Sequence, residues 1–262
     1  GGEEAVSLQL IDLTESSTKT AISFTVKGEG ETTLGGVTGE SLGKLSAKRV
    51  DLTGNIQLTQ SLGTVILDDI AAGVQIAGPA YVKGASLTAN SLGQNVTIDM
   101  AGTIKTFQVN TFAGGSLTAD VIKTVKVNQG DLGADITSQT GEITSVYAYG
   151  DITGDITAAA FIKKISSKTG GIGVDAKITA QNGDLLTVST YDTIAGKLVA
   201  DNLIKKIAVK AGNITGTVRA ANIGSVAAVN LDGAILSAAD LIGKVTLKGN
   251  ILDSYILGGY DI

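Results

Sequence analysis

An internal repeat constrains this chain more than any single residue does: the pattern apolar-x-x-apolar-x-apolar returns eleven times in 262 residues. Self-similarity at a period of about 20 residues indicates a repeat architecture, in which each unit buries its apolar face by stacking on its neighbours. The middle apolar position of successive copies falls at Leu45, Val65, Ala85, Phe107, Val125, Val146, Ile165, Leu186, Ile207, Val226 and Val245. Only Gly183, in the first column, and Ser167, in the third, interrupt the three apolar columns. We therefore expect a stack of similar units rather than a globule.

Two-residue alternation inside each copy predicts strands. In residues 204–222, Ile207 and Val209 alternate with other residues, and Gly-Asn and Thr-Gly pairs follow at positions suited to tight turns. Aromatic residues are only 4% of the chain, so the core is expected to be aliphatic and thin. The sequence predicts an all-β, single-domain parallel β-solenoid (β-helix) of about eleven rungs over residues 41–262, with about 20 residues per rung.

Two other repeat architectures fit less well. A leucine-rich horseshoe needs L-x-x-L-x-L followed by an Asn or Cys ladder and a helical stretch, and no copy continues into a helical period. A left-handed hexapeptide helix keeps strictly to about 18 residues per turn. The spacings here vary from 18 to 22 residues. We therefore expect a right-handed solenoid.

Residues 1–40 differ from the repeat. Apolar residues alternate there in two runs, at Val6, Leu8 and Leu10 and at Ile22, Phe24 and Val26. An open solenoid end presents unpaired backbone groups, so the two runs are predicted to form an antiparallel β-hairpin that caps the first rung. The alternative is that these strands belong to a preceding domain.

Composition excludes several classes of function. The chain has no Cys and no His, which removes thiolate nucleophiles, imidazole bases and the commonest transition-metal ligands. Ser-His-Asp and Cys-His hydrolases are therefore excluded. A net charge of −5 disfavours binding to nucleic acid or to an anionic membrane, and no apolar stretch reaches the roughly 18 residues of a membrane span. We expect neither a nucleic-acid partner nor membrane insertion, and no catalytic residue, cofactor or metal site.

Four stretches carry a resemblance to known proteins. FTVKGEGETTLGGVTG (24–39), SLGKLSAKRVDLTGNI (41–56), SLGTVILDDIAAG (61–73) and the closing GNILDSYILGGYDI resemble the glycine-rich β-strand repeat regions of very large secreted surface proteins of bacteria such as planctomycetes. The resemblance extends over nearly the whole chain. It implies an extracellular, surface-associated and non-catalytic role, and it supplies no functional residue to carry over.

The outward positions contain the candidate interaction sites. Tyr147 and Tyr149 project from the same side of one strand and are the best candidates for stacking against a sugar ring, although tyrosines are also ordinary strand formers. The outward column that runs from Ser46 to Thr246 is flat and largely uncharged, so it could pack side by side against another rod. Lysines recur at one corner, where a basic stripe would suit an acidic polysaccharide. A solvated corner that discourages aggregation is the simpler interpretation of these lysines.

Clustered aspartates raise the question of calcium. Asp131 precedes Asp151 by 20 residues, as Asp135 precedes Asp155, so stacking is expected to bring each pair together. Calcium binds clustered carboxylate and carbonyl oxygens. Aspartates that simply form turns are the default interpretation.

Taken together, the sequence favours a non-catalytic structural module of an extracellular bacterial surface protein. Such a module would be a rigid spacer or scaffold that self-assembles end to end or side by side into filaments or a surface layer. The alternative is an adhesin or carbohydrate-binding module for cell-surface polysaccharide. A polysaccharide lyase or glycoside hydrolase is less favoured, because those enzymes need a cleft walled by long loops, and rungs of nearly constant length leave little sequence to build one.

Overall fold

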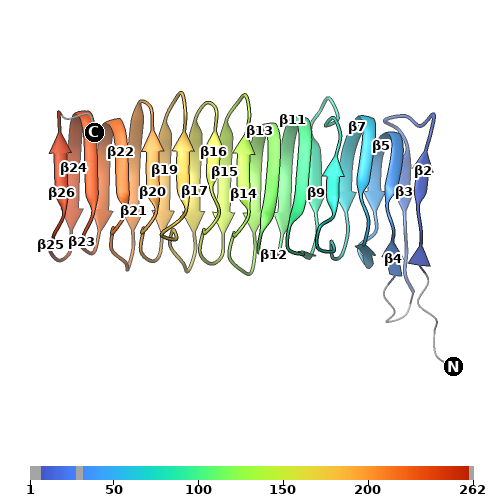
Figure 1. Cartoon of the computed structure of the whole chain (residues 1–262), viewed down its shortest axis with the longest axis horizontal. Coiled ribbons are helices and arrows are strands. Elements are labelled where there is room, and N and C mark those ends of the chain that lie inside the picture. Colours follow the sequence, from blue (N-terminus) through green and yellow to red (C-terminus); the bar gives the residue numbers. More distant parts are fainter. Residues whose placement is uncertain (1–6, 28–31, 260–262) are drawn as a thin grey trace.

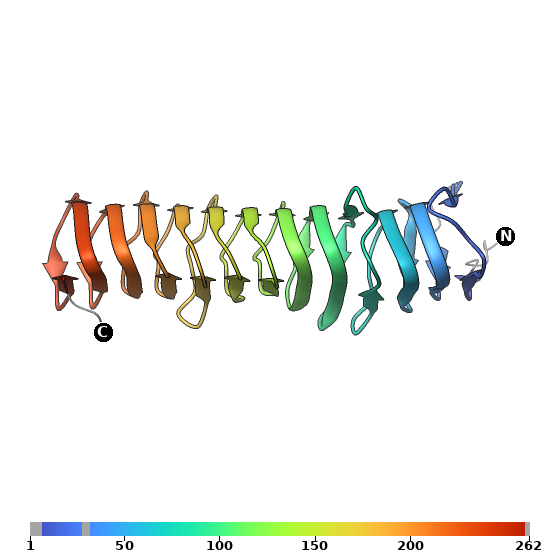
Figure 2. The same ribbon diagram turned by 90° about the horizontal axis from the view of Figure 1, so that it is seen from above.

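A computed structural model describes residues 7–27 and 32–259 and shows a β-solenoid of about twelve turns, with no helix among them. Successive turns lie side by side along one axis, from the N-terminal turn at one end of the rod to the C-terminal turn at the other (Figure 1). The view from above shows the same single row of turns (Figure 2). Neighbouring turns pair through parallel strands. The predicted all-β parallel solenoid is therefore confirmed.

Each turn contributes to three ladders of paired strands, which we call face 1, face 2 and face 3. Face 1 contains β3 (Ala21–Ser23), β9 (Ala85–Thr88), β15 (Ile143–Ala148), β17 (Ile162–Ser167), β19 (Leu185–Thr190) and β21 (Leu203–Val209). Face 2 contains β2 (Ile11–Leu13), β8 (Gln75–Ala77), β14 (Asp135–Ser138), β16 (Ile156–Ala158), β18 (Lys177–Ala180), β20 (Lys197–Ala200) and β26 (Tyr255–Gly258). Six longer strands bend from face 2 into face 1: β5 (Val37–Ser46), β7 (Ile56–Ile66), β11 (Val96–Val109), β13 (Gly115–Val127), β22 (Thr217–Ala228) and β24 (Ile235–Leu247).

Face 3 is the narrowest ladder. Its strands are β1 (Ser7–Leu8), β4 (Thr32–Leu34), β6 (Val50–Leu52), β10 (Ser91–Leu92), β12 (Thr111–Phe112), β23 (Leu231–Asp232) and β25 (Ile251–Leu252). In the middle of the rod the ladder shrinks to single bridges, such as Leu132 to Ile152 and Ile152 to Ile172. One inward apolar residue per turn is enough to close the third side of the core.

The core is a continuous apolar column enclosed by the three faces. Alternate strand residues point inward, so each turn adds Leu, Ile, Val or Ala side chains that are buried in one cluster from Leu13 to Ala238. Phe107 on face 1 and Phe112 on face 3 pack against each other inside one turn, with ring centroids 5.3 Å apart. This packing along the axis holds each turn to its neighbours.

A polar corner ladder fixes the register beside face 3. It consists of the residues just before each bridge position, all with polar side chains except Gly171, namely Asp51, Asp69, Ser91, Thr111, Asp131, Asp151, Gly171, Thr193, Asn213, Asn230 and Asn250. Several of these side chains accept a hydrogen bond from the backbone N–H of the next turn. Asn250 N, for example, donates to Oδ1 of Asn230 over 2.7 Å. The ladder supplies partners for backbone groups at a corner where the strands have ended.

In two turns the middle core residue lies two positions later in the sequence than predicted. Leu87, rather than Ala85, pairs with Val65 and Phe107 in the middle column, and Val188, rather than Leu186, pairs with Ile165 and Ile207. The other nine predicted middle positions lie in register.

Both shifts follow from a longer corner before the face 1 strand, and in the first of the two turns this corner carries an apolar residue of its own. Val82, predicted to start the third rung, lies in the segment before β9 and is 97% exposed, and Ala85 takes its place beside Ile104. In the other turn, Leu185 replaces Gly183 in the first column, opposite Ile162. The apparent break at Gly183 is therefore an error of alignment and not a gap in the core.

The N-terminal strands also differ from the prediction. β1 pairs with β4, and β2 and β3 pair with β5, all in parallel, and Ile22 lies opposite Leu45 in the middle column. They form a further solenoid turn, so the predicted antiparallel hairpin is wrong. Alternation of apolar residues predicts a strand but not the direction of its partner, and the parallel arrangement lets Ile22 extend the core. Val6 and Gly28–Gly30 lie outside the described residues.

Candidate binding surface

Face 1 carries most of the basic residues of the protein. We define the lysine face by one segment in each turn, which runs from the first core position of the apolar pattern to the residue after the third core position. The outward residues of these segments form the face, and the first segment begins at Leu42. The lysine face contains thirteen of the 20 Lys and Arg residues of the chain, namely Lys44, Lys48, Lys105, Lys123, Lys126, Lys163, Lys164, Lys168, Lys205, Lys206, Lys210, Lys244 and Lys248. The same segments contain a single acidic residue, Asp68. An acidic protein thus presents one side on which basic residues greatly outnumber acidic ones.

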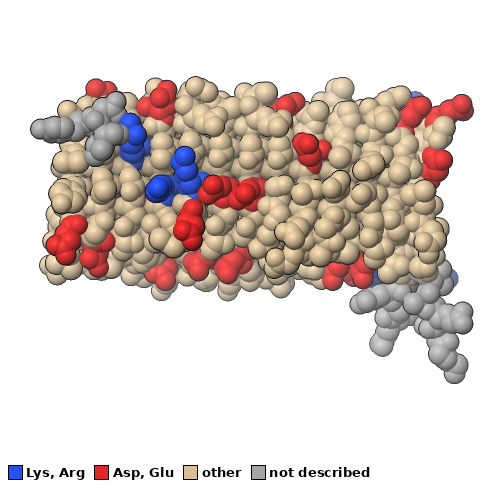
Figure 3. Space-filling model, viewed as in Figure 1, with Lys and Arg blue, Asp and Glu red and all other residues tan. Residues whose placement is uncertain are grey.

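The other sides of the rod carry the acidic residues. Figure 3 looks onto a side with few basic side chains, where acidic ones lie along both edges and across the middle. On face 2, Lys177 pairs with Lys197, and these two lysines continue the column that begins with Asp135 and Asp155. The charge asymmetry follows from the repeat, because each outward position falls on one face in every turn.

Lysines on the C-terminal half of this face recur at every second turn. The segment IKKISSK (162–168) on β17 and the segment IKKIAVK (204–210) on β21 flank the uncharged LLTVSTY (185–191) on β19. Lys164, Thr187, Lys206, Ser225 and Lys244 follow one another in register. Turns rise by about 4.8 Å, so these ammonium groups are spaced by about 9.6 Å. This spacing limits the like-charge repulsion that stacked lysines would cause.

Tyrosines and lysines alternate at the corner where face 1 ends. Lys168 Nζ lies 4.7 Å from the centroid of the Tyr149 ring, and Lys210 Nζ lies 5.2 Å from that of Tyr191. Both distances are within the range of a cation–π interaction. Each ring thereby helps to position the ammonium group of the following turn.

The two tyrosines predicted from the sequence lie in different surroundings. Tyr147 is half-buried on face 1, between Lys126 and Ser166 in its column. Tyr149 follows the end of β15 and contacts Lys168. The sequence prediction missed Tyr191, which is 43% exposed and lies two turns beyond Tyr149 in the same corner column. The two-residue misalignment of β19 concealed it.

A depression surrounds Tyr191. It has a volume of about 400 Å³, and its lining includes Lys168, Lys210, Tyr191, Ser189 and Ala208. No carboxylate lines it. Two lysines and an exposed aromatic ring therefore line the depression together with small side chains; Lys210 Nζ lies over the Tyr191 ring, and Lys168 Nζ lies over that of Tyr149.

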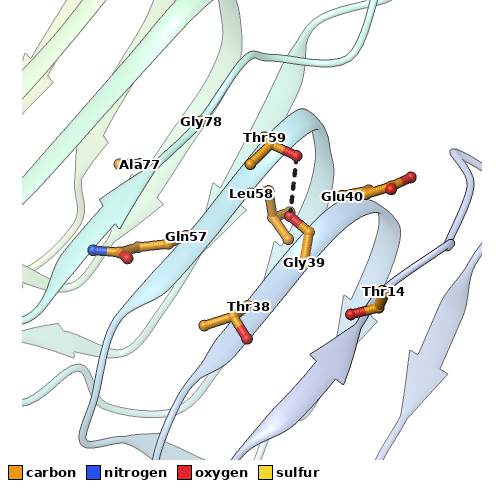
Figure 4. A pocket seen from close by; sticks show the side chains of 9 residues that line it. All are labelled: Thr14, Thr38, Gly39, Glu40, Gln57, Leu58, Thr59, Ala77 and Gly78. Atoms are coloured by element: carbon orange, nitrogen blue, oxygen red, sulfur yellow. Dashed lines mark hydrogen bonds between the residues drawn. The ribbon is translucent and has the colours of Figure 1, made fainter.

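A larger depression lies on face 2 near the N-terminal end (Figure 4). Its volume is about 670 Å³, and Thr14, Thr38, Gln57 and Thr59 contribute polar groups to it together with Glu40. Thr59 Oγ1 donates a 3.5 Å hydrogen bond to the carbonyl oxygen of Gly39 (Figure 4). With one carboxylate and no aromatic side chain in its lining, this depression lacks the paired groups of the Tyr191 depression.

Lys123 is balanced by an acidic partner. Its ammonium group donates a hydrogen bond to Oε1 of Glu142 in the next turn. This hydrogen bond, supported by the positive charge of Lys123, lowers the pKa of the Glu142 carboxyl from its usual value against the opposing effect of burial. The C-terminal lysines therefore contribute more to the positive potential of the face than Lys123 does.

The aspartate pairs lie together as predicted, but their carboxylates bind backbone groups. Asp151 N donates to Oδ1 of Asp131 over 2.7 Å, and Asp155 N donates to Oδ1 of Asp135 over 2.9 Å. Among the described residues, no three His, Cys, Asp or Glu side chains are grouped closely enough to hold a metal ion. The observed role of these aspartates is to connect successive turns.

Replacing Asp131 by Ala removes the acceptor for Asp151 N and is expected to lower the free energy of unfolding by about 0.5 to 1.5 kcal/mol. Asp131→Asn keeps an oxygen acceptor and removes a like charge near Asp151, so we expect its stability to equal or exceed that of the wild type. Urea unfolding followed by circular dichroism measures both. An equal loss in the two variants would contradict the acceptor role.

No described helix is long and apolar enough to cross a membrane. No protein-family model, curated protein or solved structure matches this chain.

Proposed function

We propose that the chain is a non-catalytic, rigid rod module of an extracellular bacterial surface protein, where it acts as a spacer or scaffold. The observation that supports this most is the continuity of the core, which runs as one apolar cluster from Leu13 to Ala238 without a break between turns. Bending the rod at any turn would separate paired strands on the outer side of the bend and expose aliphatic side chains. Such a structure holds its two ends at a fixed separation.

Exposed apolar residues at both ends support end-to-end association of copies. The C-terminal turn exposes Leu241, Ile251, Leu252, Tyr255 and Ile256 by 40 to 63%. At the other end of the rod, Leu8 is 36% and Leu10 54% exposed. A second copy fits here because its strands run in the same direction and would continue the parallel ladders. Edge strands of this kind are ready templates for further pairing.

Light scattering coupled to gel filtration, with small-angle X-ray scattering on each peak, tests both parts of the proposal. The monomer should be a rod about 55 to 60 Å long, given about twelve turns of about 4.8 Å each. Longer rods of the same cross-section should form as concentration rises, and Tyr255→Lys with Ile256→Lys should prevent them. A compact or flexible monomer would contradict the spacer role. A rod that stays monomeric at all concentrations would contradict only the end-to-end contact.

A further inference from the structure

We propose that the depression around Tyr191 binds a linear acidic polysaccharide of the polyuronate class. The two lysines and the tyrosine that would contact the polysaccharide lie on three consecutive turns. Lys168 precedes Tyr191 by one turn and Lys210 follows it by one turn at the same corner. This inference concerns a surface and does not depend on whether the rod acts as a spacer.

The lining of the depression suits an anionic sugar. Lys168 and Lys210 are exposed and can each pair with a carboxylate, while the 43% exposed ring of Tyr191 offers an apolar surface to the C–H face of a sugar. Ser189 and Ala208 pair with each other on the floor, and both are small enough to let a ring approach the strands. Cation–π contacts hold each ammonium group near a tyrosine ring, so less side-chain entropy is lost when a ligand binds.

The lysines beyond the depression extend the site along the rod. Lys164, Lys206 and Lys244 follow one column at two-turn intervals of about 9.6 Å. An extended polyuronate carries carboxylates at regular intervals along a stiff chain, so it can contact several of these ammonium groups at once. Each exposed ion pair contributes about 1 kcal/mol or less, so affinity has to come from the number of simultaneous contacts.

Nucleic acid fits this surface less well. Proteins that bind single strands use aromatic platforms on which successive bases stack. Here Tyr149 and Tyr191 are separated by a full turn that carries Lys168, so successive bases would not find neighbouring rings to stack on.

Isothermal titration with oligogalacturonate of about ten sugars, at low and at physiological salt, tests the proposal. We expect saturable binding that weakens as salt rises. The double variant K168Q/K210Q should bind about tenfold more weakly, and Tyr191→Ala about fivefold more weakly. Tyr191→Phe, which keeps the ring, should bind like the wild type. All of the changed side chains are exposed, so the variants should keep the wild-type melting temperature.

The matched control is K177Q/K197Q, which removes the same charge from neighbouring turns of face 2. It should leave affinity within about twofold of the wild type. An equal loss in this control would show that only net charge matters and would overturn the assignment. Absence of binding to oligogalacturonate, or tighter binding of a DNA oligonucleotide of equal charge, would also overturn it.

Discussion

Replacing Ile207 by Asp is expected to unfold the turns around β21. Ile207 is fully buried and lies in the middle column between Val188 and Val226. The substitution removes an aliphatic side chain whose burial contributes about 1.5 to 3 kcal/mol, and it places an unpaired carboxylate in an apolar column. We expect the free energy of unfolding to fall by at least about 4 kcal/mol. Because turns are stabilised mainly by their neighbours, the damage should begin locally.

Hydrogen exchange followed by mass spectrometry measures this effect turn by turn. Amide protection should be lost first in β19, β21 and β22, and retained longest in β5 and β7. Ala208→Asp is the matched control, since Ala208 is the next residue of the same strand and points outward. It should change stability by less than about 1 kcal/mol. Full protection in Ile207→Asp, or an equal loss in Ala208→Asp, would contradict the assigned register.

Replacing Gly216 by Ala is expected to lower the free energy of unfolding substantially, although by less than Ile207→Asp does. A Cβ at this position would lie 1.9 Å from the carbonyl oxygen of Gly196, directly below it in the stack. Backbone atoms of a paired turn cannot move aside as a flexible side chain does, so the two turns have to separate. We expect a loss of about 2 to 3 kcal/mol, comparable to overpacking of a core.

Gly114→Ala provides the comparison for this prediction. The nearest atom to a Cβ at Gly114 is Oε1 of Gln94, at 3.7 Å, which is an ordinary contact with a mobile side chain. This variant should match or slightly exceed the stability of the wild type, because alanine restricts the unfolded chain. Thermal melts of the two variants should therefore differ widely. Similar melting temperatures would show that close approach at Gly216 does not limit the spacing of turns.

The sequence was sufficient to predict the stack because the inward residues repeat with little variation. Leu45 and Val65 lie opposite each other as expected, and so do Val125 and Val146. The prediction was wrong where a corner is longer and carries its own apolar residue, as at Val82. The apolar pattern specifies only three positions, so in such a turn it can match residues of the corner. The predicted middle position then falls two residues before the true one. Only pairing with both neighbouring turns identifies Leu87 as the core residue.

The candidate binding surface was harder to predict for the same reason. Tyr149 was recognised, but its partner Lys168 and the equivalent Tyr191 become visible only when corner residues are aligned between turns. The role of Asp131 was also missed, because its acceptor contact joins residues 20 positions apart and has no local signal. Interactions that depend on the exact rise and corner geometry therefore require the structure.

The central claim is that the chain forms a rigid rod of uniform rise, and a distance measurement between spin labels tests it most directly. The chain has no Cys, so a label pair can be placed without removing native residues. Ser46 and Ala227 occupy one outward column of face 1, nine turns apart, and Ser166 lies between them, six turns from Ser46.

With cysteines at these positions, electron–electron double resonance should give narrow distributions centred near about 43 Å for Ser46→Cys/Ala227→Cys and about 29 Å for Ser46→Cys/Ser166→Cys. Two narrow peaks whose mean distances stand in the ratio of nine to six would establish a straight rod with an even rise. Broad distributions, or a longer pair no farther apart than the shorter one, would contradict the solenoid and the spacer role that depends on it.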